Sequence, residues 1–216
     1  MVLRYARAVI FDLDGTLIDS LPDIALHLNA MLSARGLAPR SLVEIGEWVG
    51  YGAEQLIVRA IPHPEDVASA LAEFRTHYRA RPVVHSRVFD GLGHELDAIA
   101  RGRKLAVLSN KPHDLTVACA DELLARWPFA MVVGQRAGKP HKPDPAALLE
   151  VTDQLAIDPS ECVMVGDSEV DIATARAANV PSIAVSWGLR PLDILVAAKP
   201  DHLVHSPREL GALFEH

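Results

Sequence analysis

Residues 8–16 read AVIFDLDGT, an apolar run that ends in two acids. An unbroken apolar run such as AVIF is typical of a strand that is buried on both faces of a parallel sheet. Asp12 and Asp14 stand at alternate positions, so their side chains project to the same side wherever the strand continues. Ligands bind at the carboxyl ends of such strands, and the stretch therefore predicts a site there. Taken alone, the two acids are also compatible with a simple turn cap.

Further runs repeat the strand pattern along the chain. The first strand is expected over residues 7–11, and the others over 104–108, 129–133, 162–165, 182–185 and 202–204. Most are separated by segments in which apolar residues have helical spacing, at 92–101, 114–125, 145–156, 171–179 and 207–214. This alternation predicts an α/β fold with a doubly wound, Rossmann-like parallel sheet.

The interval between the first two strands is too long for one crossover helix. It holds helical patterns at residues 21–32, 41–48, 53–60 and 64–80. Ser20 with Asp23 reads as a capping box at the start of the first of these helices, and Gly36 is placed to end it. We therefore predict an α/β core over residues 1–14 and 86–216, with a small inserted helical cap domain over residues 15–85.

Composition excludes several classes of partner. The formal net charge is −7 and no block of Lys or Arg stands out, which disfavours nucleic acid. No apolar stretch approaches the roughly 20 residues that cross a bilayer, and the start of the chain lacks the longer apolar region of a signal peptide. With only two cysteines, a reducing cytoplasm is the expected location. The sequence leaves the oligomeric state, monomer or dimer, open.

Residues suited to binding phosphate occur directly after the second strand and within a later loop. Ser109 and Asn110 come directly after residues 104–108, where a hydroxyl and backbone N–H groups bind phosphate oxygens, although such residues are more often helix caps. In KPHKPDP, residues 139–145, prolines restrict the backbone and stiffen the loop. We choose Lys142 over Lys139 as the phosphate-binding lysine because it directly precedes the Pro-x-Pro stretch. A solvated basic loop is the alternative.

A second acidic cluster follows the apolar strand at residues 162–165. Asp167 and Asp171 lie in GDSEVD, residues 166–171. Mg²⁺ is usually held by one or two carboxylates together with waters and substrate phosphate. Asp12 and Asp167 are therefore expected to share Mg²⁺ with a backbone carbonyl. We expect Asp171 to cap a helix and to support the metal ligands through contacts, in preference to binding the metal directly.

These four elements, in this order and each at a strand end, resemble the four motifs of the haloacid dehalogenase superfamily of phosphohydrolases. The likeness spans Asp12 to Asp171. The loop at residues 48–56, WVGYGAEQL, is similar to the specificity loop of the phosphoglycolate phosphatase branch, as are SNKP at residues 109–112 and WGLR at residues 187–190. Asn179 departs from the glycine that is common after the fourth motif, but Asn tolerates the same left-handed backbone.

The resemblance implies a magnesium-dependent phosphatase that acts on a small phosphorylated metabolite, with 2-phosphoglycolate as the best candidate. It makes Asp12 the nucleophile that becomes phosphorylated and Asp14 the acid and base, with Ser109 and Lys142 holding the phosphate. The implied metal ligands are Asp12, Asp14 and Asp167, with Asp171 in support. The implied substrate-binding residues are Thr16, Gly50, Gly52, Ser109, Asn110 and Lys142.

Other functions share these residues. A phosphomutase or pyrophosphatase of the same superfamily would also use Asp12 and Asp14. A dehalogenase is disfavoured, because the superfamily's dehalogenases lack an acid equivalent to Asp14. From a different class, a non-catalytic module that binds a phosphorylated metabolite remains an alternative, which a magnesium-dependent phosphate-release assay would distinguish.

Overall fold

The core of the protein is a sheet of six parallel strands in a computed structural model that describes residues 3 and 5–215. Along the sheet the order is β5-β4-β1-β6-β7-β8, the doubly wound arrangement predicted from the sequence. The strands are β1 (Ala8–Phe11), β4 (Lys104–Pro112), β5 (Phe129–Gln135), β6 (Cys162–Gly166), β7 (Ser182–Val185) and β8 (His202–Val204). The predicted fold class is thus confirmed. Residues 1, 2, 4 and 216, at the ends of the predicted core, lie outside the described residues.

Strand β1 lies in the middle of the sheet, which explains its wholly apolar sequence. Phe11, at its end, pairs with Val107 of β4 on one side and with Val165 of β6 on the other. Chain order reverses between these neighbours, and ligands of doubly wound sheets bind at such a switch point. Asp12 therefore emerges where the carboxyl ends of three strands meet.

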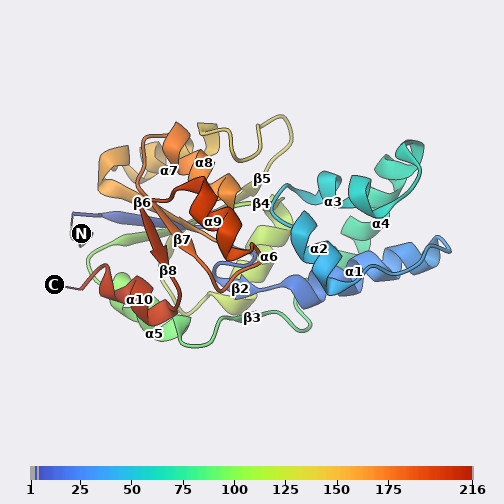
Figure 1. Ribbon diagram of the computed structural model, residues 1–216, viewed down its shortest axis with the longest axis horizontal. Coiled ribbons are helices and arrows are strands. Elements are labelled where there is room, and N and C mark those ends of the chain that lie inside the picture. The colour runs from blue at the N-terminus through green and yellow to red at the C-terminus, as the bar shows by residue number, and fades with distance from the viewer. Residues whose placement is uncertain (1–2, 4, 216) are drawn as a thin grey trace.

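Helices flank both sides of the sheet (Figure 1), and alternate residues of the strands pack against one layer or the other. On one face, Val9 and Phe11 pack in a cluster with α5 (Leu92–Ile99), α6 (His113–Leu123) and α10 (Pro207–Ala212). On the other, Ala8 and Ile10 pack with α7 (Ala146–Leu155) and α8 (Glu169–Ala177). Helix α9 (Leu192–Ala198) adds a smaller cluster beside β7. Both faces of the sheet are covered, as the sequence of β1 predicts.

Four helices form a separate layer at the end of the molecule away from the termini (Figure 1). They are α1 (Leu21–Ala34), α2 (Leu42–Trp48), α3 (Ala53–Ala60) and α4 (Val67–Ala80), with a short 3₁₀ turn at Pro64–Asp66. Their side chains share an apolar cluster of their own. Two short antiparallel strands, β2 (Ile18–Asp19) and β3 (Arg87–Val88), pair where the chain leaves and re-enters the core. We call α1–α4 the cap; the division at 14/15 and 85/86 stays a prediction.

The capping box predicted at the start of α1 is wrong. Ser20 makes no side-chain capping bond and instead donates to Asp14 Oδ1 at 2.6 Å. The carboxylate of Asp23 turns to the returning segment, where it accepts the backbone N–H groups of residues 84, 85 and 86 at 2.8–3.0 Å. Long-range partners thus outcompete the local pattern. Gly36 does follow α1 with a positive φ of 69°, as expected.

Strand β4 departs from regular pairing where it approaches the site. Its register against β5 is irregular between Leu108 and Pro112. Such irregularities re-aim side chains, and here they affect Ser109, Asn110 and Lys111. Within the described residues no helix is long and apolar enough to cross a membrane.

Candidate active site

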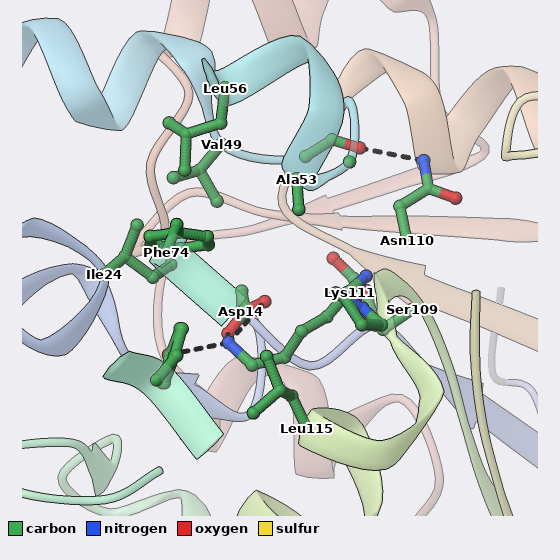
Figure 2. A pocket seen from close by; sticks show the side chains of 15 residues that line it. Asp14, Ile24, Val49, Ala53, Leu56, Phe74, Ser109, Asn110, Lys111 and Leu115 are labelled. Atoms are coloured by element: carbon green, nitrogen blue, oxygen red, sulfur yellow. Dashed lines mark hydrogen bonds and ion pairs between the residues drawn. The ribbon is translucent and has the colours of Figure 1, made fainter. Parts of the chain in front are cut away.

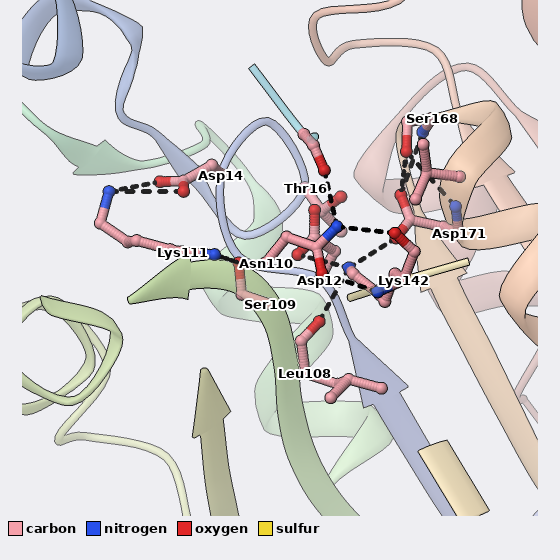
Figure 3. A network of polar contacts seen from close by, with 12 residues as sticks. Asp12, Asp14, Thr16, Leu108, Ser109, Asn110, Lys111, Lys142, Ser168 and Asp171 are labelled. Atoms are coloured by element: carbon pink, nitrogen blue, oxygen red, sulfur yellow. Dashed lines mark hydrogen bonds and ion pairs between the residues drawn. The ribbon is translucent and has the colours of Figure 1, made fainter. Parts of the chain in front are cut away.

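Three buried carboxylates converge at the carboxyl end of the central strands. Asp12 follows β1, Asp167 follows β6, and Asp171 lies in the first turn of α8. One ligand oxygen from each lies within 4.8 Å of the others. Figure 3 shows Asp12 and Asp171 turned toward Lys142. The fold therefore brings together acids that are 159 residues apart in the chain.

Lys142 is the cation of this cluster. Its Nζ lies 2.9 Å from Asp12 Oδ1 and donates to Asp171 Oδ1 at 2.7 Å and to the Leu108 carbonyl at 2.9 Å. Lys139 lies elsewhere, 3.6 Å from Glu150 with half of its side chain exposed. The structure thus places Lys142, and not Lys139, beside Asp12.

The Asn110 amide holds the backbone of Lys142. Its Oδ1 accepts the Lys142 N–H at 2.8 Å, and its Nδ2 donates to the Lys142 carbonyl at 3.0 Å. The same Nδ2 also donates to the Gly50 carbonyl of the cap at 2.9 Å. Predicted as a substrate-binding residue, Asn110 is committed here to positioning the lysine and the cap loop.

The site has an excess of negative charge. Burial raises the pKa of Asp12 to about 6, opposed by the Lys142 ammonium and reinforced by Asp171 and Asp14. Burial likewise raises the pKa of Asp167 to about 7, with the charges of Asp171 and Asp12 adding to the effect. Three carboxylates face one ammonium, so the ionised cluster is two charges short of neutral.

The arrangement fits a divalent cation. Asp12 Oδ1 is buried and, among the described residues, is contacted by the Lys142 ammonium at 2.9 Å as an ion pair and by no other hydrogen-bond donor. Carboxylate oxygens are the hard ligands that Mg²⁺ prefers. The carboxylate of Asp14, predicted as a ligand, does not belong to this cluster, and Asp171, predicted in support, does.

Asp171 also caps α8, as the sequence predicts. Its Oδ2 accepts the N–H of Ser168 at 3.2 Å and the Ser168 hydroxyl at 2.6 Å, and the Ser168 side chain in turn caps the helix. One carboxylate oxygen is thus used by the helix start and the other by Lys142. These contacts fix Asp171 at the back of the cluster.

Asp167 is held in a tight pocket of backbone. Its Oδ2 accepts the Leu189 N–H at 2.7 Å, and its Oδ1 accepts the Thr16 hydroxyl at 3.1 Å. A Cβ on Gly188 would lie 2.3 Å from the Asp167 Cβ, so only glycine fits there. Thr16, predicted to bind substrate, is almost fully buried and supports Asp167 instead.

Asp14 faces the other side of the site, toward the cap. Both of its oxygens lie within 3.3 Å of Lys111 Nζ, and Lys111 also donates to the Tyr78 hydroxyl of α4 at 2.7 Å. Burial opposes the charge of Lys111, but the Asp14 carboxylate and Tyr78 raise the pKa of Lys111 above its usual range. Lys111 is therefore an ammonium at neutral pH.

A cleft between core and cap connects these groups (Figure 2). Asp12, Asp14, Ser109 and Lys111 line it on the core side. The cap contributes mainly apolar side chains and glycine: Ile24, Val49, Gly50, Gly52, Ala53, Leu56, Phe74 and Tyr78.

The glycines of the cap loop allow a close approach to the core. Gly50 and Gly52 have φ values of 103° and 91°. A Cβ on Gly52 would lie 2.9 Å from the ring of His141, and one on Gly50 would lie 3.1 Å from Arg190 Nη2. Both predicted residues line the cleft, and larger side chains would push the loop off the core.

Arg190 and Glu169 of the core hold the same loop. Arg190 donates to the carbonyl groups of Gly46 at 3.0 Å and Val49 at 2.5 Å, and to Glu169 at 3.1 Å. The hydroxyl of Tyr51 donates to Glu169 as well. These contacts bridge core and cap beside the cleft.

Comparison with known proteins decides the family. The sequence profile described as haloacid dehalogenase-like hydrolase matches residues 9–185. The chain belongs to this family. It is 35% identical over 212 residues to a phosphoglycolate phosphatase of Xanthomonas campestris, covering 96% of each protein. A phosphoglycolate phosphatase of Rhodospirillum rubrum is 39% identical over 193 residues, covering 84% of this chain and 80% of that protein.

Solved structures agree with this assignment. The crystal structure of a predicted phosphoglycolate phosphatase from Haemophilus somnus has a TM-score of 0.90 and 26% identity, covering 98% of this chain and 99% of that one. The predicted resemblance to haloacid dehalogenase hydrolases of the phosphoglycolate phosphatase-like branch is confirmed, as is the prediction of a phosphatase.

Sequence reasoning named no role for Lys111, Arg190 or Glu169 in this hydrolase. Lys111 and Arg190 stood within SNKP and WGLR, the two stretches quoted for their likeness to the family. Lys111 follows the polar pair Ser109 and Asn110 and precedes Pro112, so no local pattern marked it as buried. Nothing local in the sequence points to Glu169.

Proposed function

We propose that this hydrolase removes phosphate from a small phosphorylated carboxylic acid, with Mg²⁺ as cofactor and Asp12 as the group that is phosphorylated. The observation that carries the proposal is the convergence of Asp12, Asp167 and Asp171 around Lys142, with Asp12 Oδ1 accepting no hydrogen bond from the described residues. The Asp12 carboxylate, ion-paired with the Lys142 ammonium, is thus positioned to act as a ligand or as a nucleophile.

Asp12 and Asp167 would hold the metal, with Asp171 behind them. Bound there, Mg²⁺ supplies positive charge that offsets the repulsion between a carboxylate nucleophile and a phosphate. At ~4 Å that repulsion is about 4 kcal/mol for unit charges at an effective dielectric of 20. The single ammonium of Lys142 balances only one of the three carboxylates. The negative charge that remains favours binding of a cation.

The first chemical step belongs to Asp12. One carboxylate oxygen attacks phosphorus, the bond between phosphorus and the substrate oxygen breaks, and Asp14 gives its proton to the departing oxygen. Lys142 and the hydroxyl of Ser109 hold phosphoryl oxygens in line for the attack. Ser109 is buried at the cleft floor, which suits that role.

The second step releases phosphate. A water molecule gives a proton to Asp14 and attacks phosphorus, and the bond between phosphorus and the Asp12 oxygen breaks. Inorganic phosphate leaves, and both acids return to their starting states. One residue serves as acid and then as base: Asp14 gives a proton in the first step and regains one from water in the second.

The best candidate substrate is 2-phosphoglycolate. Support comes from the relatives in Xanthomonas campestris and Rhodospirillum rubrum, which are named phosphoglycolate phosphatases. The narrow cleft with few polar groups on the cap side also favours a small leaving group over a sugar or nucleotide. The location in the cytoplasm and the oligomeric state stay predictions.

A substrate panel tests the proposal. Purified protein is assayed for phosphate release from 2-phosphoglycolate, sugar phosphates, nucleotides and pyrophosphate, with Mg²⁺ and with a chelator. We expect release that needs Mg²⁺ and is fastest with 2-phosphoglycolate. Preference for pyrophosphate, isomerisation of a sugar phosphate without release, or binding without turnover would each replace the proposal with one of the alternative functions.

A further inference from the structure

Lys111 is the one cation among the described residues that line the cleft. Its side chain is 4% exposed, and Figure 2 shows it reaching along the cleft toward Asp14. The other charged lining residues are Asp12 and Asp14, and the buried Lys142 contacts Asp12 without being one of the lining residues. Any negative charge on the leaving group would therefore meet a single ammonium.

The cap side of the cleft offers little to a neutral, polyhydroxylated leaving group. The Tyr78 hydroxyl is its main polar atom, since the other cap lining residues are aliphatic, glycine or Phe74. Sugar hydroxyls buried there would lack partners, at a cost of about 1–3 kcal/mol each. Tyr78 is itself fixed by stacking on His27, with ring centroids 4.6 Å apart.

Lys111 and the phosphate-holding residue lie close in the chain. Lys111 N–H donates to Ser109 Oγ at 3.3 Å, and both residues line the same cleft. A ligand that contacts both side chains therefore needs its phosphoryl group and a second anion in one small molecule. Phosphate esters with a carboxylate on a short carbon chain meet that requirement.

We propose that Lys111 binds the second anionic group of the substrate, and that this contact releases Asp14 for catalysis. The inference rests on the proposed function and deepens it. Without substrate, Asp14 is engaged by Lys111 and by the Ser20 hydroxyl. A substrate carboxylate takes over the ammonium, so that Lys111 stays paired, while Asp14 takes up a proton from solvent and turns to the bridging oxygen as its donor.

The exchange makes recognition and reaction one event. A phosphate ester without the second anion leaves the pair between Asp14 and Lys111 intact, and its leaving oxygen lacks a proton donor. Selectivity then appears in kcat as well as in KM. A lysine that only stabilised the fold would show no such dependence on the substrate.

The test compares 2-phosphoglycolate with 2-hydroxyethyl phosphate, which has two carbons but no carboxylate, in wild type, Lys111→Met and Lys111→Arg. We expect Lys111→Met to lower kcat/KM for 2-phosphoglycolate by at least tenfold and on the order of a hundredfold, the loss typical of a buried charged hydrogen bond. For 2-hydroxyethyl phosphate it should change little or rise, because Asp14 is freed. Lys111→Arg should restore part of the selectivity.

Two further measurements keep the result interpretable. Lys139→Met, the same change at an exposed lysine, should behave as wild type, and thermal unfolding shows whether Lys111→Met is folded. Glycolate should inhibit p-nitrophenyl phosphate hydrolysis by wild type and lose that effect in Lys111→Met.

Equal loss on both esters in a folded Lys111→Met variant, or unchanged inhibition by glycolate, would overturn the proposal. Failure of the proposed function looks different, because wild type itself would then release no phosphate from 2-phosphoglycolate.

Discussion

The two walls of the cleft differ in what they contribute. The core wall is dense in charge, with Asp12, Asp14, Ser109 and Lys111 lining it and Lys142 beneath. The cap wall is apolar except for Tyr78 and is fastened to the core by Arg190. From this contrast we expect that the core determines which bond is broken and that the cap, with Lys111, determines which molecule fits.

Two buried lysines express the same contrast. Lys142 and Lys111 have side chains that are 3% and 4% exposed, and they pair with Asp12 and Asp14 respectively. All contacts of Lys142 come from the core, whereas Lys111 shares its ammonium between the core and Tyr78 of the cap. Lys142 is thus expected to act on every substrate, and Lys111 to depend on the substrate.

The largest effect separates the two lysines directly. Lys142→Met should lower kcat for every phosphate ester by on the order of 10²–10³-fold, because the ammonium paired with Asp12 is lost. Steady-state kinetics on 2-phosphoglycolate and p-nitrophenyl phosphate measure it, with Lys139→Met as the matched control. A loss confined to one ester would mean that Lys142 acts like Lys111.

A smaller, selective effect is expected on the cap wall. Gly50→Val places a side chain where a Cβ is already 3.1 Å from Arg190, in a backbone with φ of 103°. Displacement of the loop should lower kcat/KM for 2-phosphoglycolate by roughly ten- to a hundredfold. The kcat/KM for p-nitrophenyl phosphate should fall less, because its leaving group departs without contacts to the cap loop. An equal fall on both substrates would contradict the division between the walls.

The smallest effect is on stability and concerns the core wall without metal. Because the pKa of Asp167 is raised to about 7, the folded state favours its protonated form. Its contribution to stability is fully present below the ordinary pKa and is lost as pH rises through 7. In a chelator, Asp167→Asn should therefore melt about 2–8 °C above wild type at pH 8 and show little gain at pH 5.

Added Mg²⁺ should reverse that order, because only wild type keeps both ligands. Asp121→Asn, at an exposed position of α6, serves as the control and should match wild type at both pH values. If the difference in melting temperature between Asp167→Asn and wild type does not change with pH, the buried negative charge of Asp167 does not destabilise the fold, and this prediction is wrong.

Local patterns predicted the sheet and the main acids but not the partners that cross the fold. The apolar run at β1 requires burial on both faces, and this requirement places Asp12 at the centre of the sheet. Lys111 could not be oriented, because β4 loses regular alternation between Leu108 and Pro112. The capping box predicted for Ser20 and Asp23 was wrong for a related reason. The Asp23 carboxylate accepts hydrogen bonds from residues 84–86, which are distant in sequence, in place of a local cap.

The most direct test of the account is to look for phosphate on Asp12. Wild type is mixed with phosphorus-radiolabelled 2-phosphoglycolate and Mg²⁺, quenched in acid within milliseconds, digested and mapped by mass spectrometry. We predict label on the peptide of residues 8–16, at Asp12, and none in a folded Asp12→Asn variant, which should have no measurable turnover. Ordinary turnover by Asp12→Asn, or label on a different residue, would contradict the account.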